Sequence, residues 1–306
     1  MTKAKFIIVI IGPTAIGKTA LSIAIATKLN CPIISADSRQ FYKEMNIGTA
    51  KPTALEMQEV QHYFINSHSI TDDYNVGKFE IEVIALLEKL FQTTNQVIVV
   101  GGSGLYIDAI CKGFDDLPEA DPKTRNEINL LFESKGIEGL QELLKKLDIN
   151  YYHQVDLNNP QRLSRALEVC ITSGKPYSEL RKGKSTKRIF KTIKIGLNTS
   201  RETLYARINA RVDDMMTSGL LNEVKSLLPY KHLNALQTVG YKELFSYLEN
   251  KISIDAAVES IKQNTRKFAK RQLTWFRRDE EIKWLEPNEI DNMIEHINEK
   301  INSSTC

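Results

Sequence analysis

The chain has 306 residues, of which 42% are hydrophobic and 26% are charged, and this composition is ordinary for a globular protein with a core of its own. The formal net charge is only +3, so the overall charge identifies no class of partner. The four cysteines form no CxxC pair, which argues against a disulfide framework or a zinc site: Cys31, Cys111, Cys170 and Cys306. No stretch approaches the roughly 20 apolar residues of a membrane span, so we expect a cytoplasmic protein with no membrane partner.

Strands and helices alternate along the first third of the chain. Phe6–Ile11 is a continuous apolar run, typical of a strand that is buried on both faces. A helix, a strand, a helix and a strand follow in that order: Thr19–Asn30, Pro32–Ala36, Phe79–Phe91 and Val97–Val100. Together with a later strand at Lys191–Leu197, this order predicts an α/β fold, a P-loop NTPase-like parallel sheet flanked by helices.

The middle of the chain has a different character. Between Asp115 and Arg188 the sequence is polar, has a helical pattern and contains no segment typical of a strand. We therefore expect an inserted helical domain at residues 115–190. It separates a first part of the core, residues 1–114, from a last part, residues 191–306, which completes the sheet and adds a basic helical region. The end of the chain, Ser-Ser-Thr-Cys, has the composition of a frayed tail.

A phosphate-binding loop follows the first strand. The segment fits the pattern G-x-x-x-x-G-K-[ST] and stands between a strand and a helix, as the motif requires: Gly12, Pro13, Thr14, Ala15, Ile16, Gly17, Lys18 and Thr19. Glycines let the backbone approach phosphate oxygens, and the helix N-terminus presents free N–H groups to them. Lys18 adds a positive charge, and the Thr19 hydroxyl can bind a Mg²⁺ ion that shares the phosphates. The motif predicts a phosphate or diphosphate site, without a preference for ATP.

Two further segments end strands of the predicted sheet. Asp37 follows the second strand and should face the same crevice as the P-loop, because ligands of open α/β sheets lie outside the carboxyl ends of the strands. There it could act as a base or bind metal, or it could merely cap a helix or turn. Gly101-Gly-Ser-Gly104 follows the third strand and offers the Ser103 hydroxyl. No aspartate ends Val97–Val100, which counts against an ordinary ATPase.

A helix predicted at Ile254–Arg278 is apolar on one side and basic on another. The first face holds Val258, Ile261, Thr265, Phe268, Gln272 and Trp275, and the second holds Lys262, Arg266, Lys270 and Arg277. A basic helix with nearby aromatic residues suits a phosphate backbone, although a solvated charged face would have the same pattern. Arg162 and Arg165, three residues apart in the insertion, form a second and weaker basic element.

These segments together resemble the tRNA dimethylallyltransferase (isopentenyltransferase) family. The matching segments run in order over nearly the whole chain: Gly12–Thr19, Asp37–Gln40, Met45–Pro52, Gly101–Tyr106, Leu117–Pro122, Gln161–Glu168, Val239–Tyr241 and Lys270–Arg277. The family often has Gly-Gly-Thr-Gly where this chain has Ser103, and the hydroxyl is kept.

The resemblance implies a reaction and a set of site residues. The dimethylallyl group of dimethylallyl diphosphate would pass to N6 of the adenine at tRNA position 37, in tRNAs that read codons starting with U. Lys18, Thr19 with Mg²⁺, and Arg211 would bind the diphosphate, Asp37 would accept the N6 proton, and Ser103 would hydrogen-bond nearby. The residues expected to contact tRNA are Asp37, Ser38, Arg39, Gln40, Ser103, Arg125, Gln161, Arg162, Leu163, Ser164, Arg165, Lys270, Arg271 and Arg277. We expect a monomer.

Three other functions share parts of this pattern. A small-molecule P-loop kinase would have the same loop and sheet, but it leaves the basic C-terminal helix unexplained. An enzyme that prenylates free adenine nucleotides would not need the inserted domain. A non-catalytic RNA-binding protein would not need Lys18, Thr19 and Asp37 together.

Overall fold

The computed structural model describes residues 4–115, 117–119, 121–181, 183 and 186–303. The chain forms two compact units, the first comprising Met1–Cys111 with Arg188–Cys306 and the second comprising Lys112–Lys187. The limits of the second unit lie three residues before those expected for the insertion. Within the described ranges, no helix is both long enough and apolar enough to cross a membrane.

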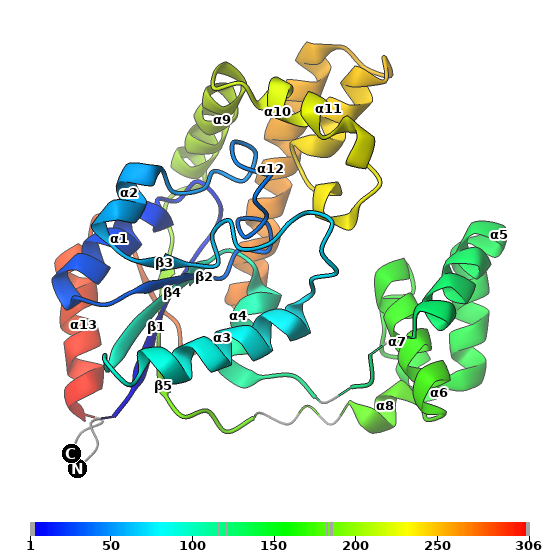
Figure 1. Ribbon diagram of the computed structural model, residues 1–306, viewed down its shortest axis with the longest axis horizontal. Helices are drawn as coiled ribbons and strands as arrows, with labels where there is room; N and C mark the ends of the chain where they lie inside the picture. Colours follow the sequence, from blue (N-terminus) through cyan, green and yellow to red (C-terminus); the bar gives the residue numbers. More distant parts are fainter. Residues whose placement is uncertain (1–3, 116, 120, 182, 184–185, 304–306) are drawn as a thin grey trace. The chain divides into compact units, whose positions relative to one another are not determined.

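The first unit is built on a six-stranded sheet (Figure 1). Its strand order is β3-β2-β4-β1-β5-β6, and each pair of neighbouring strands is parallel. The strands are β1 (Phe6–Ile11), β2 (Ile33–Ser35), β3 (His62–Tyr63), β4 (Gln96–Gly101), β5 (Lys191–Leu197) and β6 (Lys283–Leu285). The expected α/β fold with a parallel sheet is confirmed.

Alternate residues of β1 pack on opposite faces of the sheet, as the pleat of a strand requires. Ile8 and Ile10 contact helices α1 (Lys18–Leu29), α9 (Arg201–Thr217) and α13 (Ile290–Ser303) through one apolar cluster. Ile7, Val9 and Ile11 contact α3 (Val76–Leu90) and α4 (Gly104–Lys112) through another. Both faces are covered, which explains why β1 is apolar without alternation.

A third apolar cluster lies beyond the sheet, where helices pack on one another. It joins the segment Phe41–Met45 to α9 and to three helices that follow it in the chain, with Tyr241 fully buried among them. These helices are α10 (Leu220–Ser226), α11 (Tyr241–Leu248) and α12 (Ile254–Phe276); the shorter elements of this unit are α2 (Ala54–Glu59), η1 (Leu228–Tyr230) and η2 (Asn234–Leu236).

Several boundaries differ from the sequence prediction. Helix α3 begins at Val76, three residues before the predicted start, because the Asn75 side chain accepts hydrogen bonds from the N–H groups of Gly77 and Lys78. Strands β3 and β6 and helix α13 were not predicted. The tail predicted to fray, Ser-Ser-Thr-Cys, lies outside the described residues except for Ser303, the last residue of α13.

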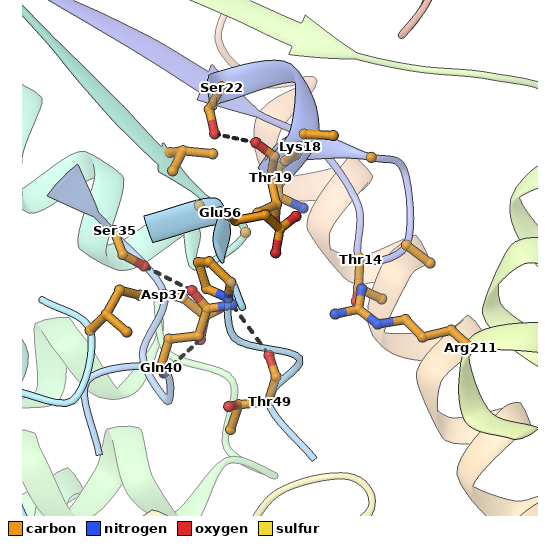
Figure 2. A pocket seen from close by; sticks show the side chains of 18 of the residues that line it. Thr14, Lys18, Thr19, Ser22, Ser35, Asp37, Gln40, Thr49, Glu56 and Arg211 are labelled. Atoms are coloured by element: carbon orange, nitrogen blue, oxygen red, sulfur yellow. Dashed lines mark hydrogen bonds between the residues drawn. The ribbon is translucent and has the colours of Figure 1, made fainter. Parts of the chain in front are cut away.

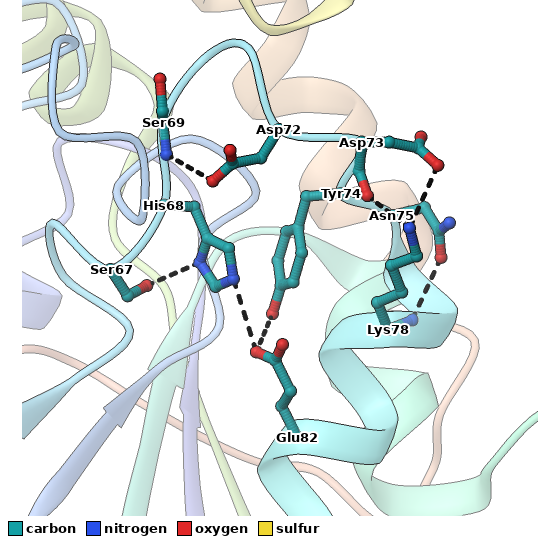
Figure 3. A network of polar contacts seen from close by, with 9 residues as sticks. All are labelled: Ser67, His68, Ser69, Asp72, Asp73, Tyr74, Asn75, Lys78 and Glu82. Carbon is teal, nitrogen blue, oxygen red and sulfur yellow. Dashed lines mark hydrogen bonds and ion pairs between the residues drawn. The ribbon is translucent and has the colours of Figure 1, made fainter.

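The segment that leads into α3 is held by a network of polar contacts (Figure 3). Glu82 on α3 accepts a hydrogen bond of 2.8 Å from the Tyr74 hydroxyl and lies 3.5 Å from Nε2 of His68. The His68 and Tyr74 rings pack with centroids 3.7 Å apart, and Tyr74 also contacts the ring of Phe41. These contacts fix the segment against the chain that follows β2.

The second unit is a helical bundle with its own apolar core. Its helices are α5 (Pro122–Leu147), α6 (Ile149–Tyr152), α7 (Pro160–Ser173) and α8 (Tyr177–Leu180). Leu140, Leu144, Leu163 and Leu167 are fully buried in the core. Gly136 has a left-handed φ of 65° and marks a kink within α5. The expectation of a helical segment without strands holds for the described part of this unit.

Candidate active site

A cavity of about 360 Å³ lies at the carboxyl ends of β1, β2 and β4 (Figure 2). Among the residues expected at the site, eight line it: Thr14, Ala15, Gly17, Lys18, Thr19, Asp37, Gln40 and Arg211. Arg207, Thr49, Glu56, His62, Phe268 and Gln272 also line it and were not assigned to the site from the sequence. The cavity therefore brings the P-loop, the turn after β2 and the helices α9 and α12 together.

The P-loop turns sharply between β1 and α1. Ala15 and Gly17 both have left-handed backbone angles, with φ of 63° and 103°. Gly12, Pro13 and Ile16 are buried, so only part of the motif faces the cavity. Lys18 Nζ donates to the carbonyl oxygens of Gly12, at 3.0 Å, and Pro13, at 2.8 Å. The Lys18 side chain thus reaches back across the P-loop to its first two residues.

The charge state of Lys18 depends on its surroundings. Burial, reinforced by the nearby Arg211 guanidinium and opposed by Asp37, lowers the pKa of Lys18 to about 7. Arg211 lies with Nη1 3.4 Å from the Thr14 hydroxyl, and Arg207 donates to the carbonyl of Ile16 at 3.2 Å. Three cationic side chains therefore surround the loop, and an anion placed among them would relieve their mutual repulsion.

Gln272 connects α12 to two loops of the site. Its Oε1 accepts a 2.9 Å hydrogen bond from the Thr14 N–H, and its Nε2 donates to the Gly102 carbonyl at 2.9 Å. The sequence placed Gln272 on the packed face of its helix but gave it no role. An amide side chain on the packed face of a helix was the available signal, because a buried amide needs partners.

Asp37 is both a turn residue and a cavity residue. Its Oδ1 accepts from the N–H groups of Arg39, at 2.9 Å, and Gln40, at 3.4 Å, which is the turn role that the sequence left open. Oδ2 makes no hydrogen bond to any described residue, and Asp37 lines the cavity. One oxygen thus fixes the side chain while the other stays open for a ligand.

Ser103 lies between two loops. Its hydroxyl accepts from the Ser38 N–H at 3.0 Å and donates to the Ser38 hydroxyl at 3.1 Å. Arg39 bonds back to the carbonyl of Ser38 through Nη1, at 3.3 Å. Ser103 therefore ties the turn after β4 to the turn that carries Asp37, and these hydrogen bonds are structural.

The residues around Thr19 suit a Mg²⁺ ion. Thr19 shares the cavity with the carboxylates of Asp37 and Glu56, and hydroxyl, carboxylate and phosphate oxygens are the ligands that Mg²⁺ prefers. The described residues contain no cluster of three or more His, Cys, Asp or Glu side chains able to hold a metal alone. Such an ion would need oxygens from a bound diphosphate.

The basic face of α12 is only partly available to a ligand. Lys262 forms ion pairs with Asp213 on α9 and with Glu259 on α12 itself. Arg266 donates to Asn209 on α9. Both side chains thus have partners on α9, and the binding of phosphate by this face of the helix stays a prediction. Three basic residues of the same helix end are exposed: Lys270, Arg271 and Arg277.

In the second unit, α7 carries the expected basic pair. Arg165 and Arg125 both bond to the carboxylate of Glu168, at 3.4 and 3.1 Å. Gln161 and Arg162 are exposed, and Ser164 is half-buried. Leu163 is fully buried in the core of the unit, so its side chain cannot reach an RNA, contrary to expectation.

Sequence relatives cover almost the whole chain. A family model described as IPP transferase matches residues 40–279. The tRNA dimethylallyltransferase of Flavobacterium johnsoniae is 52% identical over 307 residues, covering 98% of this chain and 99% of that protein. That of Christiangramia forsetii is 52% identical over 301 residues, covering 98% of this chain and 100% of that protein.

Solved structures share the fold. The full-length tRNA isopentenylpyrophosphate transferase of Bacillus halodurans has a TM-score of 0.73 and 34% identity, with 98% of each chain covered. A eukaryotic dimethylallyltransferase, solved in snapshots of its action on tRNA, has a TM-score of 0.77 and 28% identity. That match covers 97% of this chain and 77% of the eukaryotic one.

Proposed function

Because the chain belongs to the IPP transferase family, we propose that it transfers the dimethylallyl group of dimethylallyl diphosphate to N6 of an adenosine at tRNA position 37. This adenosine lies beside the anticodon in tRNAs that read codons starting with U. The bond between C1 and the ester oxygen of the diphosphate breaks, a bond between C1 and N6 forms, and diphosphate leaves with the electron pair. The observation that carries the proposal is that Lys18, Arg211 and Asp37 line one cavity.

The cationic end of the cavity suits the diphosphate. The Gly17 turn, Lys18 and Arg211 offer backbone and side-chain donors where negative charge grows as the leaving group departs. Donors that are already in place need no reorganisation during the reaction, so they stabilise the transition state more than the substrate. When bound beside Thr19, Mg²⁺ would add charge neutralisation of the diphosphate.

Asp37 suits the role of proton acceptor. An exocyclic amine becomes acidic as its nitrogen bonds to carbon, so a carboxylate can take the proton. The open Oδ2 can receive this proton while Oδ1 stays bound to the turn. Ser103 does not line the cavity and holds the turn in place through Ser38, so in place of the expected contact near the substrates we assign it the positioning of Asp37.

The acceptor must leave its base stack to enter the cavity, at a cost of a few kcal/mol. Exposed basic residues of α12 and α7 are the groups we assign to tRNA phosphates, Lys270, Arg271, Arg277 and Arg162 among them. We expect the enzyme to act as a monomer in the cytoplasm. A small-molecule kinase is the second candidate, and the absence of an aspartate at the end of β4 disfavours it.

A transfer assay tests the proposal. Protein and tRNA are incubated with labelled dimethylallyl diphosphate or with labelled ATP, and we expect label in the RNA from the prenyl donor only. Asp37→Asn keeps an oxygen for the turn and removes the base, so kcat should fall by about 10²-fold or more with tRNA affinity nearly unchanged. Label transferred from ATP would contradict the proposed function. Full turnover in Asp37→Asn would contradict the assignment of Asp37 as the base.

A further inference from the structure

A carboxylate outside the cavity lining, that of Glu223 on α10, accepts four hydrogen bonds. Oε2 accepts from the backbone N–H groups of Asn46, at 2.9 Å, and Ile47, at 2.7 Å. Oε1 accepts from the N–H of Gly48, at 3.0 Å, and from the hydroxyl of Tyr241, at 2.6 Å. Three consecutive N–H groups that converge on one anion form a nest of the kind that binds phosphate. Here a side chain of the protein itself fills the nest.

The Tyr241 ring packs directly against the backbone of the same loop at Gly48. The ring is fully buried, and a Cβ added at Gly48 would lie 2.6 Å from it. Only glycine allows the loop to approach this ring so closely. The contact joins the segments Met45–Pro52 and Val239–Tyr241. Both resemble the family in sequence, and the sequence analysis assigned neither a function.

The anchored loop leads directly to the cavity. The carbonyls of Thr49 and Ala50 both accept from Nε2 of Gln40, each at 3.2 Å, and Oε1 of Gln40 accepts from the Ser35 hydroxyl at 3.0 Å (Figure 2). Gln40 and Thr49 line the cavity, and the Gln40 N–H bonds to Asp37. A continuous set of hydrogen bonds therefore runs from Glu223 to the turn that carries Asp37.

We propose that Glu223 is a positioning residue for prenyl transfer: it holds residues 46–50 so that Gln40 and Asp37 face the acceptor base. Glu223 acts only through the loop and touches no substrate. Its influence should fall on the acceptor side, because the P-loop that binds the diphosphate belongs to a different segment. The inference rests on the proposed function, since its first measurement is the rate of transfer.

Glu223→Gln is the sharpest test, because the amide keeps the size of the side chain while its NH₂ group opposes backbone donors. We expect kcat to fall by about tenfold or more, as small misplacements of reacting groups cost that much. The KM for dimethylallyl diphosphate should stay within about threefold of wild type, since the donor contacts are untouched. Tyr241→Phe removes one of the four hydrogen-bond donors to Glu223, so its kcat should fall less than that of Glu223→Gln. Glu202→Gln, at an exposed position of α9, is the control and should match wild type.

Hydrogen exchange supplies a readout that does not depend on activity. In Glu223→Gln, the amides of residues 46–48 should exchange faster than in wild type, while those of β1 should be unchanged. Wild-type kcat in Glu223→Gln would overturn the inference. So would a loss in which donor KM and the exchange of β1 change together with kcat, because that pattern indicates general destabilisation. A wild-type protein that transfers no prenyl group would instead refute the proposed function, and the exchange of residues 46–48 would still decide whether Glu223 holds the loop.

Discussion

Lys18 lies where its positive charge destabilises the empty protein and would be compensated by a bound anion. Burial and the Arg211 guanidinium lower the pKa of Lys18 to about 7, against an ordinary value of 10.5. Its hydrogen bonds within the chain are to the neutral carbonyls of Gly12 and Pro13, which compensate little for the missing hydration. The site therefore favours a bound anion at the expense of the stability of the empty protein, an arrangement common at functional sites.

Replacing this lysine should stabilise the protein while it abolishes transfer. The unfolded chain keeps the lysine proton up to about pH 10.5, whereas the folded protein keeps it only up to about pH 7. The buried charge therefore lowers the free energy of unfolding by its full amount below pH 7, and this loss disappears as the pH rises to 10.5. We expect Lys18→Met to raise the unfolding free energy by about 1–3 kcal/mol near pH 7, with no gain near pH 10.5. Denaturant unfolding at both pH values measures this. The control, Lys28→Met at the exposed end of the same helix, should change stability little at either pH.

The same pKa predicts how donor binding depends on pH. In the proposed function the protonated Lys18 attracts the diphosphate, and the protonated fraction in the free enzyme falls as pH rises above about 7. The KM for dimethylallyl diphosphate should therefore increase between pH 7 and 9, by up to about tenfold per pH unit. Lys18→Arg keeps its charge over this range, so its KM should be higher but flat. A wild-type KM that does not change with pH would contradict the lowered pKa.

At the level of elements, α4 and α12 approach each other too closely for any residue but glycine at the start of α4. A Cβ added at Gly104 would lie 2.3 Å from Cδ1 of Trp275, and the Trp275 indole N–H donates to Asp108 at 2.9 Å. The turn at Gly101–Gly104, which the sequence singled out for its glycines and for the Ser103 hydroxyl, is thus fixed by the helix that also carries Gln272.

This close approach predicts a coupled pair of substitutions. Gly104→Ala should destabilise the protein by about 1–3 kcal/mol, because the indole must shift in a packed interior. Adding Trp275→Leu makes room for the methyl group, so the double variant should be more stable than the sum of the single losses implies. Thermal unfolding of the four proteins completes the cycle. Additive losses would show that the two side chains do not meet.

The sequence predicted the long apolar strands and missed the short strands β3 and β6 at the edges of the sheet, together with helix α13. Apolar runs such as Phe6–Ile11 and the P-loop pattern carry enough information by themselves, and both lie where expected. Strand β6 has only three residues and exists because it pairs with β5 at the edge of the sheet. The roles of Arg207 and Gln272 were missed for the same reason, since each reaches the P-loop from more than 180 residues away in the chain.

At the scale of the whole molecule, both units offer exposed basic side chains. Arg162 on α7 is exposed, while Arg165 shares Glu168 with Arg125, so we expect Arg165 to contribute less to phosphate binding. Lys270 on α12 and Arg277 directly after this helix are also exposed, unlike Lys262 and Arg266. The basic residues that the sequence grouped by helical face are therefore divided by their partners in the fold.

If both units bind one tRNA at the same time, their effects on the salt dependence of binding should add. Removing one cation that binds a phosphate reduces the slope of log K against log salt by about 0.7–0.9. We expect a lower slope for the single variant Arg162→Gln and for the double variant Lys270→Gln/Arg277→Gln. When all three substitutions are combined, the slope should fall by the sum of the two reductions. Lys28→Gln, whose charge is paired with Asp291, should leave the slope unchanged. Binding measured at several salt concentrations decides this. A slope altered by changes in only one unit would mean that the other unit does not touch the phosphates, and a combined reduction smaller than the sum would mean that the two surfaces bind the RNA in alternation.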